Sequence, residues 1–295
     1  MKQTVIVYGA GTMGAGIAAC GAVHGHPVIL IDTDLGKAQA GLQRACQNIE
    51  QLAGAGLVSQ DTARESAGLL AADTEISSYL DDACIVIEAV YEDLEIKRAV
   101  FKKLDEIVPE HIIITSNTSG MMLKLFTQGI AHPERTAISH FWFPGHLIPL
   151  VEIVKGAYTT EETLIQVKDL LASWGKAPVI VREDLPGQLA NRILQAIIRE
   201  AVNIVERGLA SPEDVDTAIK MGMAVRLPAW GPLEHIDAVG LDLAHSVQKD
   251  VLPEISGSAA PGKMLSDMVA QGHLGHKTGS GFYDWKVKDM SALAA

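Results

Sequence analysis

The sequence predicts a doubly wound α/β domain with a mostly parallel sheet, followed by a smaller all-helical domain. Short apolar runs alternate with helical patterns as far as Val181, and a glycine-rich turn joins the first run to the first helix. Strand and helix in turn are typical of a parallel sheet with helices on both faces. We therefore place residues 1–185 in a nucleotide-binding α/β domain and residues 186–295 in a helical domain.

The predicted strands are nearly continuous apolar runs, as expected for a sheet that is buried on both faces. They cover residues 4–8, 27–31, 83–90, 111–115, 136–139, 150–154 and 177–181. Between these strands, one helical pattern ends at Val23, and three others cover residues 34–52, 94–107 and 160–174.

The second half begins after the Pro186-Gly187 break with a helical pattern over residues 188–207. Its apolar residues recur on more than one face, so we expect this helix to be buried on most sides. Glycines and prolines separate the shorter helices that follow. We expect the tail after Trp285 to be loosely ordered.

The first turn reads Gly9-Ala-Gly11-Thr12-Met13-Gly14 between a predicted strand and a predicted helix. This is the context that a dinucleotide-binding fingerprint of the Rossmann type requires. Gly9 permits the tight turn, Gly11 lets the backbone approach the pyrophosphate, and Gly14 lets helix and strand pack closely. The helix that begins at Thr12 and Met13 offers free N–H groups to phosphate.

Asp32 ends the second predicted strand. A carboxylate at this point accepts hydrogen bonds from the adenosine ribose and repels a 2′-phosphate, which predicts NAD rather than NADP as the cofactor. In the alternative interpretation, Asp32 only caps the next helix and the glycines only form a turn.

Composition argues against several classes of partner. The net charge of −12 argues against nucleic acid, and no apolar run is long enough to span a membrane. Cys20, Cys46 and Cys84 show no metal or redox spacing, so we expect no metal, no disulfide framework and a reducing cytoplasm without a signal peptide. We expect a small-molecule substrate and a homodimer, because an apolar helical domain often doubles as a dimer interface.

His140 near the end of one apolar run and Glu152 inside the next form the most informative polar pattern. Imidazole exchanges protons near neutral pH, and a neighbouring carboxylate can fix its tautomer and stabilise its charged form. Asn117, Ser119 and His140 all fall just after predicted strand ends, where ligands of such sheets bind. The alternatives are a structural histidine at 140 and a structural ion pair at 152.

Further motifs accompany this pair. They are Gly9-x-Gly11-x-x-Gly14, Ile87-Glu88-Ala-Val-Tyr-Glu92, Ser116-Asn-Thr-Ser119, His140-Phe, Pro149-Leu-Val-Glu152, Pro186-Gly187…Asn191-Arg192 and Gly275-His-Lys277-Thr-Gly-Ser-Gly-Phe-Tyr. In combination they resemble the L-3-hydroxyacyl-CoA dehydrogenase family over nearly the whole chain. The resemblance implies an NAD-dependent oxidoreductase of fatty acid metabolism, similar to 3-hydroxybutyryl-CoA dehydrogenase, that oxidises the secondary hydroxyl of an L-3-hydroxyacyl substrate.

The resemblance also implies roles for individual residues. His140 is the general base that removes the hydroxyl proton, and Glu152 orients and polarises it. Ser119 and Asn191 hold the substrate oxygen and its carbonyl, which suits an amide donor. Near the cofactor lie Glu92, Lys97, Asn117 and Lys277. The alternatives are a helix cap at Ser119, a first-turn residue bonding a loop at Asn191, and a residue lining a turn at Lys277.

Two departures from the family bear on the substrate. Members that bind coenzyme A usually carry lysines in the insertion after the second strand, but here residues 45–96 contain one base, Arg64, and eleven acids. Phosphates on such a surface would lack charge-assisted hydrogen bonds. The family also has asparagine three residues after the catalytic histidine, where this chain has Phe143.

Arg226 lies five residues before Gly231-Pro232, an arrangement similar to the lambda-crystallin/gulonate dehydrogenase branch, which oxidises small free acids. Because a guanidinium matches a carboxylate through two parallel bonds, we hypothesise that Arg226 binds the carboxylate of a short 3-hydroxy acid. A coenzyme A thioester stays open, as does a surface or inter-subunit role for Arg226. The alternative from another class is a non-catalytic NAD-binding protein, crystallin-like or a sensor, against which the intact site speaks.

Overall fold

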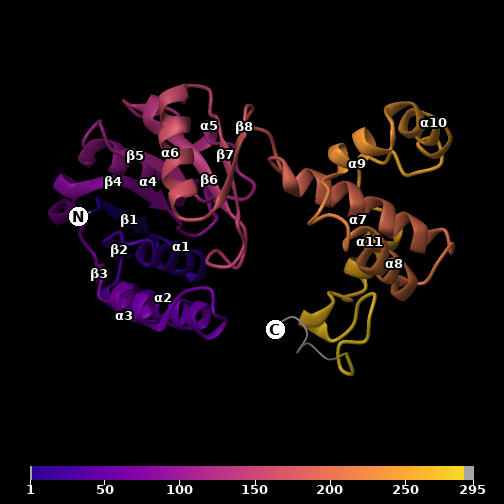
Figure 1. The fold of residues 1–295 in the computed structure, drawn as a ribbon, viewed down its shortest axis with the longest axis horizontal. Helices are drawn as coiled ribbons and strands as arrows, with labels where there is room; N and C mark the ends of the chain where they lie inside the picture. The colour runs from indigo at the N-terminus through magenta and orange to yellow at the C-terminus, as the bar shows by residue number, and fades with distance from the viewer. Residues whose placement is uncertain (1, 289–295) are drawn as a thin grey trace. The chain divides into compact units, whose positions relative to one another are not determined.

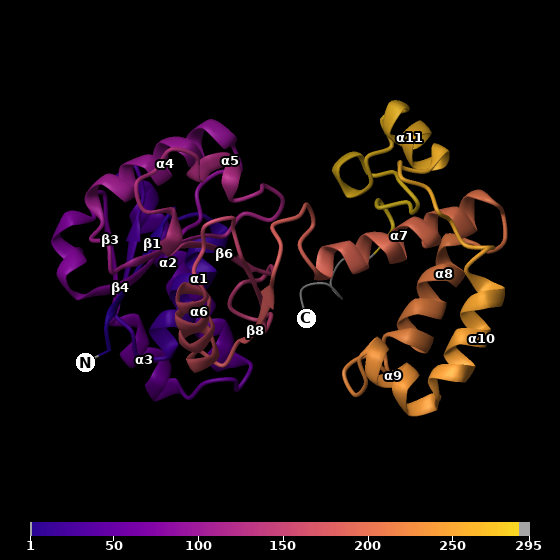
Figure 2. The ribbon, with the colours of Figure 1, turned by 90° about the horizontal axis from the view of Figure 1, so that it is seen from above.

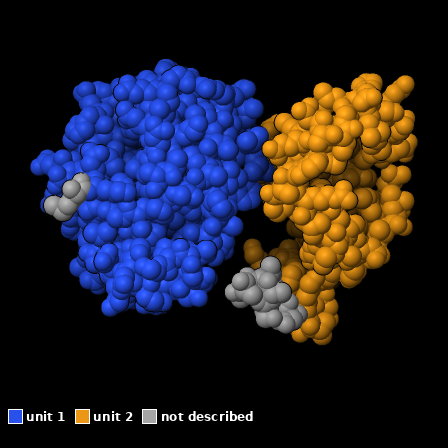
Figure 3. Space-filling model, viewed as in Figure 1, with its two compact units in different colours: residues 1–190 blue, residues 191–295 orange. Residues whose placement is uncertain are grey.

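The computed structural model describes residues 2–288, which divide into two compact units at Ala190 (Figure 3). Most of the tail after Trp285 lies outside the described residues. No helix in the described part of the chain is both long enough and apolar enough to cross a membrane.

The first unit is built on an eight-stranded sheet with the order β3-β2-β1-β4-β5-β6-β7-β8 (Figures 1 and 2). The strands are β1 (Thr4–Tyr8), β2 (Val28–Ile31), β3 (Leu70–Asp73), β4 (Ala83–Glu88), β5 (Ile113–Ser116), β6 (Thr136–Phe141), β7 (Leu150–Val154) and β8 (Ala177–Val181). Only β6 and β7 pair antiparallel; the other neighbours are parallel. The predicted doubly wound, mostly parallel sheet is confirmed.

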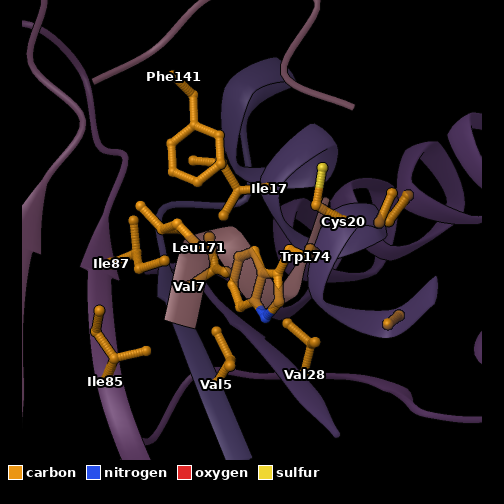
Figure 4. Close-up of a cluster of buried hydrophobic side chains, with 14 of the residues drawn as sticks. Val5, Val7, Ile17, Cys20, Val28, Ile85, Ile87, Phe141, Leu171 and Trp174 are labelled. Carbon is orange, nitrogen blue, oxygen red and sulfur yellow. The ribbon is translucent and has the colours of Figure 1, made fainter. Parts of the chain in front are cut away.

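Helices cover both faces of this sheet. They are α1 (Thr12–Val23), α2 (Leu35–Gly54), α3 (Gln60–Ala67), α4 (Leu94–Ile107), α5 (Lys124–Thr127) and α6 (Glu161–Ser173). Alternate residues of β1 point to opposite faces: Val5 and Val7 pack in the cluster around Ile17 and Trp174 (Figure 4), whereas Ile6 packs with Phe101 of α4.

The helix starts follow from capping side chains. Asp34 and Asp93 accept hydrogen bonds from backbone N–H groups in the first turns of α2 and α4, and Thr160 does so for α6. The cap of α2 is therefore Asp34, so the interpretation of Asp32 as that cap is wrong.

The second unit is helical, as predicted, and its described part, residues 191–288, contains isolated bridges but no strand. Its helices are α7 (Ala190–Glu206), which starts in the first unit, α8 (Pro212–Ala218), α9 (Pro232–Val239), α10 (Leu241–Val251) and α11 (Lys263–Ala270), with a π-helical turn at Ile219–Met223.

The expectation that the first of these helices is buried on most sides is wrong. Val202 is the one buried residue of α7, while Ile193, Leu194 and Ile198 are exposed. A unit of about a hundred residues has too little mass to enclose a helix that is apolar on several faces. The apolar pattern of α7 therefore includes residues that its own unit does not cover.

Candidate active site

In the glycine-rich turn after β1, packing requires glycine at two positions and does not require it at a third. Gly9 has φ 114°, and a Cβ there would lie 2.5 Å from the carbonyl of Ala89. A Cβ on Gly14 would lie 1.9 Å from the carbonyl oxygen of Gly9. A Cβ on Gly11 would meet nothing within 4 Å. Packing explains Gly9 and Gly14, whereas Gly11 leaves an open space at the N-terminus of α1 that fits a phosphate-bearing cofactor.

Gly11→Ala is therefore expected to weaken NAD binding without unfolding the chain. The added methyl group occupies the open space, so the dissociation constant for NAD should rise by about tenfold or more. Titration calorimetry with NAD and a thermal melt measure the two effects. Gly14→Ala is the matched comparison and should lower the melting temperature. A Gly11→Ala protein with unchanged NAD affinity would contradict this role.

The peptide before Gly11 is held by charged groups on both sides. The Ala10 N–H donates to Asp32 Oδ2 at 3.0 Å, and the Arg44 guanidinium of α2 donates to the Ala10 carbonyl at 2.7 Å. Thr33 N–H donates to Asp32 Oδ1 at 2.8 Å. The Asp32 carboxylate therefore lies against the glycine-rich turn. Sequence reasoning missed Arg44, because nothing in the spacing of α2 links it to the turn.

A buried ion pair lies at the ends of β4 and β5. Lys97 Nζ is 2.9 Å from Glu88 Oε1, and both side chains are buried. Ser116 Oγ and Val90 N–H also donate to the Glu88 carboxylate. Lys97 lies 3.2 Å from Glu92 Oε2. Lys97 is thus engaged by two carboxylates and ties Glu92 in the loop after β4 to Glu88 at the end of that strand.

His140 and Glu152 face each other directly across β6 and β7. His140 lies inside β6, rather than after its end as predicted, because the strand continues to Phe141. Its Nδ1 is 2.9 Å from Glu152 Oε2. A carboxylate only accepts hydrogen bonds, so Nδ1 carries the proton and the lone pair of the neutral ring is on Nε2.

The Glu152 carboxylate is fully buried and accepts four hydrogen bonds. Oε2 receives His140 and the Trp142 indole N–H, and Oε1 receives the backbone N–H groups of Leu189 and Ala190, each at 2.8 Å. Burial opposes ionisation, but the hydrogen bonds outweigh it and lower the Glu152 pKa from 4.5 to about 2. Sequence reasoning missed Trp142 and these backbone donors.

A cavity of about 510 Å³ brings the first-unit candidates together. Its lining includes the turn at Gly11, Thr12 and Met13, and the side chains of Glu92, Lys97, Asn117, Ser119 and His140. The Asn117 side-chain oxygen accepts from Phe141 N–H at 2.9 Å, which orients its amide. In the described part of the chain, neither the Ser119 hydroxyl nor His140 Nε2 has a hydrogen-bond partner. The cavity therefore brings an imidazole with an unpartnered Nε2 and a hydroxyl group to the lining that also includes the glycine-rich turn.

The remaining candidates, Asn191, Arg226 and Lys277, belong to the second unit. Asn191 accepts a hydrogen bond from Gln195 in the first turns of α7, and Lys277 is exposed in the turn His276–Thr278. Arg226 lines an apolar pocket of about 800 Å³ together with Trp230 and His235. The Arg226 side chain is exposed and makes no ion pair with the described residues.

Comparison with known proteins accounts for both halves of the chain. Residues 4–185 match the family model of the 3-hydroxyacyl-CoA dehydrogenase NAD-binding domain, and residues 187–285 match that of the C-terminal domain. The chain is 35% identical to a probable 3-hydroxybutyryl-CoA dehydrogenase of Bacillus subtilis, over 98% of this chain and 99% of that protein.

Another relative is named for a different substrate. It is the 5-formyl-3-hydroxy-2-methylpyridine 4-carboxylate 5-dehydrogenase of Mesorhizobium japonicum, 33% identical over 100% of this chain and 94% of that protein. A crystal structure of a dehydrogenase for that acid, described as an NAD⁺-dependent dismutase, has a TM-score of 0.87 at 30% identity and covers 100% and 94% of the two chains.

Proposed function

This chain belongs to the 3-hydroxyacyl-CoA dehydrogenase family, and we propose that it oxidises the secondary hydroxyl of an L-3-hydroxyacyl substrate in an NAD-dependent reaction. The observation that supports this most is the cavity in which His140, held by Glu152, stands beside Ser119 and the nucleotide turn. A secondary alcohol needs a base at its hydroxyl group and an acceptor for hydride.

His140 is the proposed base. Glu152 fixes the proton on Nδ1, so Nε2 takes the proton of the substrate hydroxyl, and the buried carboxylate stabilises the resulting imidazolium. Ser119 holds the same oxygen with its otherwise unpartnered hydroxyl group. Asn191 is proposed to hold the substrate carbonyl.

The cofactor is proposed to lie along the turn at Gly9, Gly11 and Gly14 and on the N-terminus of α1, with Asp32 at the ribose. When bound, NAD supplies the hydride acceptor. Thr12, Met13, Glu92 and Asn117 line the cavity and are proposed to contact the cofactor, and Lys97 supports Glu92. Lys277 is also proposed as a cofactor-binding residue.

A matched pair of substrates tests this proposal. Purified protein is mixed with NAD and either a free L-3-hydroxy acid or its coenzyme A thioester, and the absorbance of reduced nicotinamide is followed. Reduction with at least one of the pair is the expected result. If NAD binds but is not reduced with any 3-hydroxy compound, the proposal is contradicted and a non-catalytic NAD-binding protein is favoured.

A second candidate substrate carries a free carboxylate in place of coenzyme A. It is favoured by Arg226, an exposed cation without an ion-pair partner in residues 2–288, at an apolar pocket. The insertion with one base and eleven acids in residues 45–96 lacks cations for the phosphates of coenzyme A. The Mesorhizobium relative, whose name gives a pyridine carboxylate as its substrate, supports the same reading.

Arg226→Ala is expected to raise the KM for a free 3-hydroxy acid by about 10- to 100-fold, the size of a charge-assisted hydrogen-bond pair. The KM for the thioester should not change. Arg207→Ala is the matched control, since Arg207 is partnered by the Glu254 carbonyl and does not line the pocket. If Arg226→Ala left the KM of every active free acid unchanged, Arg226 would have no role in carboxylate binding.

We also propose a homodimer. Apolar side chains of the second unit, including Ile193, Leu194 and Ile198 of α7, are exposed within that unit. Exposed apolar patches of this kind mark surfaces that associate. Sedimentation analysis of the purified protein tests the proposal: a monomer at micromolar concentration would contradict it.

A further inference from the structure

The loop between β6 and β7, residues 142–149, is fixed on both sides of Phe143. On one side, the Trp142 indole donates to Glu152 at 3.0 Å. On the other, Lys176 Nζ donates to the carbonyls of Gly145 and Ile148 at 2.7 and 2.9 Å. Cys20 Sγ also donates to the Gly145 carbonyl at 3.3 Å. The backbone that carries Phe143 is therefore anchored to β7, to α1 and to Lys176, the residue before β8.

Phe143 is nevertheless 67% exposed, whereas Phe141, two residues earlier, is 1% exposed and lies in the core cluster shown in Figure 4. Phe143 lines the same cavity as His140 and Ser119, together with the exposed side chain of Tyr91. An aromatic ring on an anchored backbone loses little conformational freedom when a ligand covers it. The cavity therefore presents an apolar ring on an anchored backbone three residues after the proposed base.

We infer that Phe143 is a specificity-determining residue that packs against an aromatic ring carried by the substrate next to the reacting carbon. The inference rests on the proposed function. A phenyl ring has no hydrogen-bonding group, so it selects apolar surface and not a polar chain. Its quadrupole favours a second ring in an offset or edge-to-face arrangement over an alkyl group.

Substrate preference tests the inference. The kcat/KM values for 3-hydroxy-3-phenylpropanoate and 3-hydroxybutanoate are measured with NAD for the wild type, Phe143→Leu and Phe143→Tyr. Phe143→Leu keeps an apolar side chain but removes the ring, so the preference for the phenyl compound should fall about 5- to 10-fold. Phe143→Tyr keeps the ring and should retain the preference.

Tyr158→Leu is the control, because Tyr158 is an exposed aromatic residue outside the cavity and its loss should change neither value. The nicotinamide ring of the cofactor is the alternative aromatic partner for Phe143. A Phe143→Leu protein with a higher KM for NAD and an unchanged phenyl-to-methyl ratio would assign the ring to the cofactor and overturn the inference.

Two further outcomes separate this inference from the proposed function. If the wild-type protein oxidises both alcohols and Phe143→Leu loses activity equally on both, the inference is overturned and the proposed function stands. A wild-type protein that oxidises neither these alcohols nor their coenzyme A thioesters would remove the proposed function, and the inference with it.

Discussion

His140→Gln is expected to lower the rate of substrate oxidation by at least about a hundredfold, the lower end of what a general base contributes. Glutamine can still bond Glu152 through its amide N–H, but it has no basic atom in place of Nε2. Binding of NAD should be retained, since the glycine turn and Asp32 do not depend on the imidazole. Initial rates of NAD reduction and a titration with NAD measure both properties.

His146→Gln is the matched control for this substitution. His146 lies in the loop after β6, but its ring bonds the exposed side chain of Gln51 and does not line the cavity. Its substitution should leave the rate near that of the wild type. A His140→Gln protein with more than about one hundredth of the wild-type rate would argue against His140 as the base.

Glu152→Gln is expected to impair both stability and rate. The carboxylate has two acceptor oxygens that serve four donors, whereas an amide has one acceptor oxygen and an NH₂ group that confronts donors. Each buried donor left without a partner costs about 1–3 kcal/mol. If the amide N–H faces His140, the ring must keep its proton on Nε2, which leaves no lone pair for the substrate hydroxyl.

The pH dependence of stability has a definite sign at this residue. Because the Glu152 pKa is lowered from 4.5 to about 2 in the fold, its contribution is present above pH 4.5 and is lost as pH falls toward 2. The difference corresponds to about 3 kcal/mol. Denaturant unfolding between pH 7 and the acid range should show a steeper loss of stability in the wild type than in Glu152→Gln.

Glu161→Gln provides the control for that comparison. Glu161 is an exposed carboxylate paired with Lys155 and Arg182, and those partners hold its pKa below the usual value as well. Surface pairs contribute little to stability, so the substitution of Glu161 should change neither the rate nor the loss of stability at acidic pH by much. If the wild type and Glu152→Gln lost equal stability between pH 7 and the acid range, the Glu152 carboxylate would not be the source of the stabilisation.

The sequence predicted the features that depend on local pattern. The strands of the parallel sheet are continuous apolar runs, and the glycine turn has a strict local order, so both were visible before the structure. β3 was missed because its four residues, Leu70–Asp73, form a half-buried edge strand with two alanines, which have weak strand preference.

The hydrogen bonds that hold the site residues in place were not predicted, because they join segments that are distant in the sequence. Arg44 reaches the Ala10 carbonyl across 34 residues, and Glu152 accepts from backbone N–H groups 37 and 38 residues later. Backbone donors leave no trace in residue identity. The left-handed conformation of Gln188, with φ 50°, also sets where α7 begins, which the apolar periodicity placed two residues too early.

The most direct test of the central claim is transfer of a label from the substrate to the cofactor. An L-3-hydroxy acid and its coenzyme A thioester, each deuterated at C3, are incubated with the wild-type protein and NAD, and the reduced cofactor is analysed by mass spectrometry. Reduced nicotinamide that carries the deuterium, formed by the wild type but not by His140→Gln, is the predicted result. NAD that binds but stays oxidised with every labelled alcohol would contradict the claim.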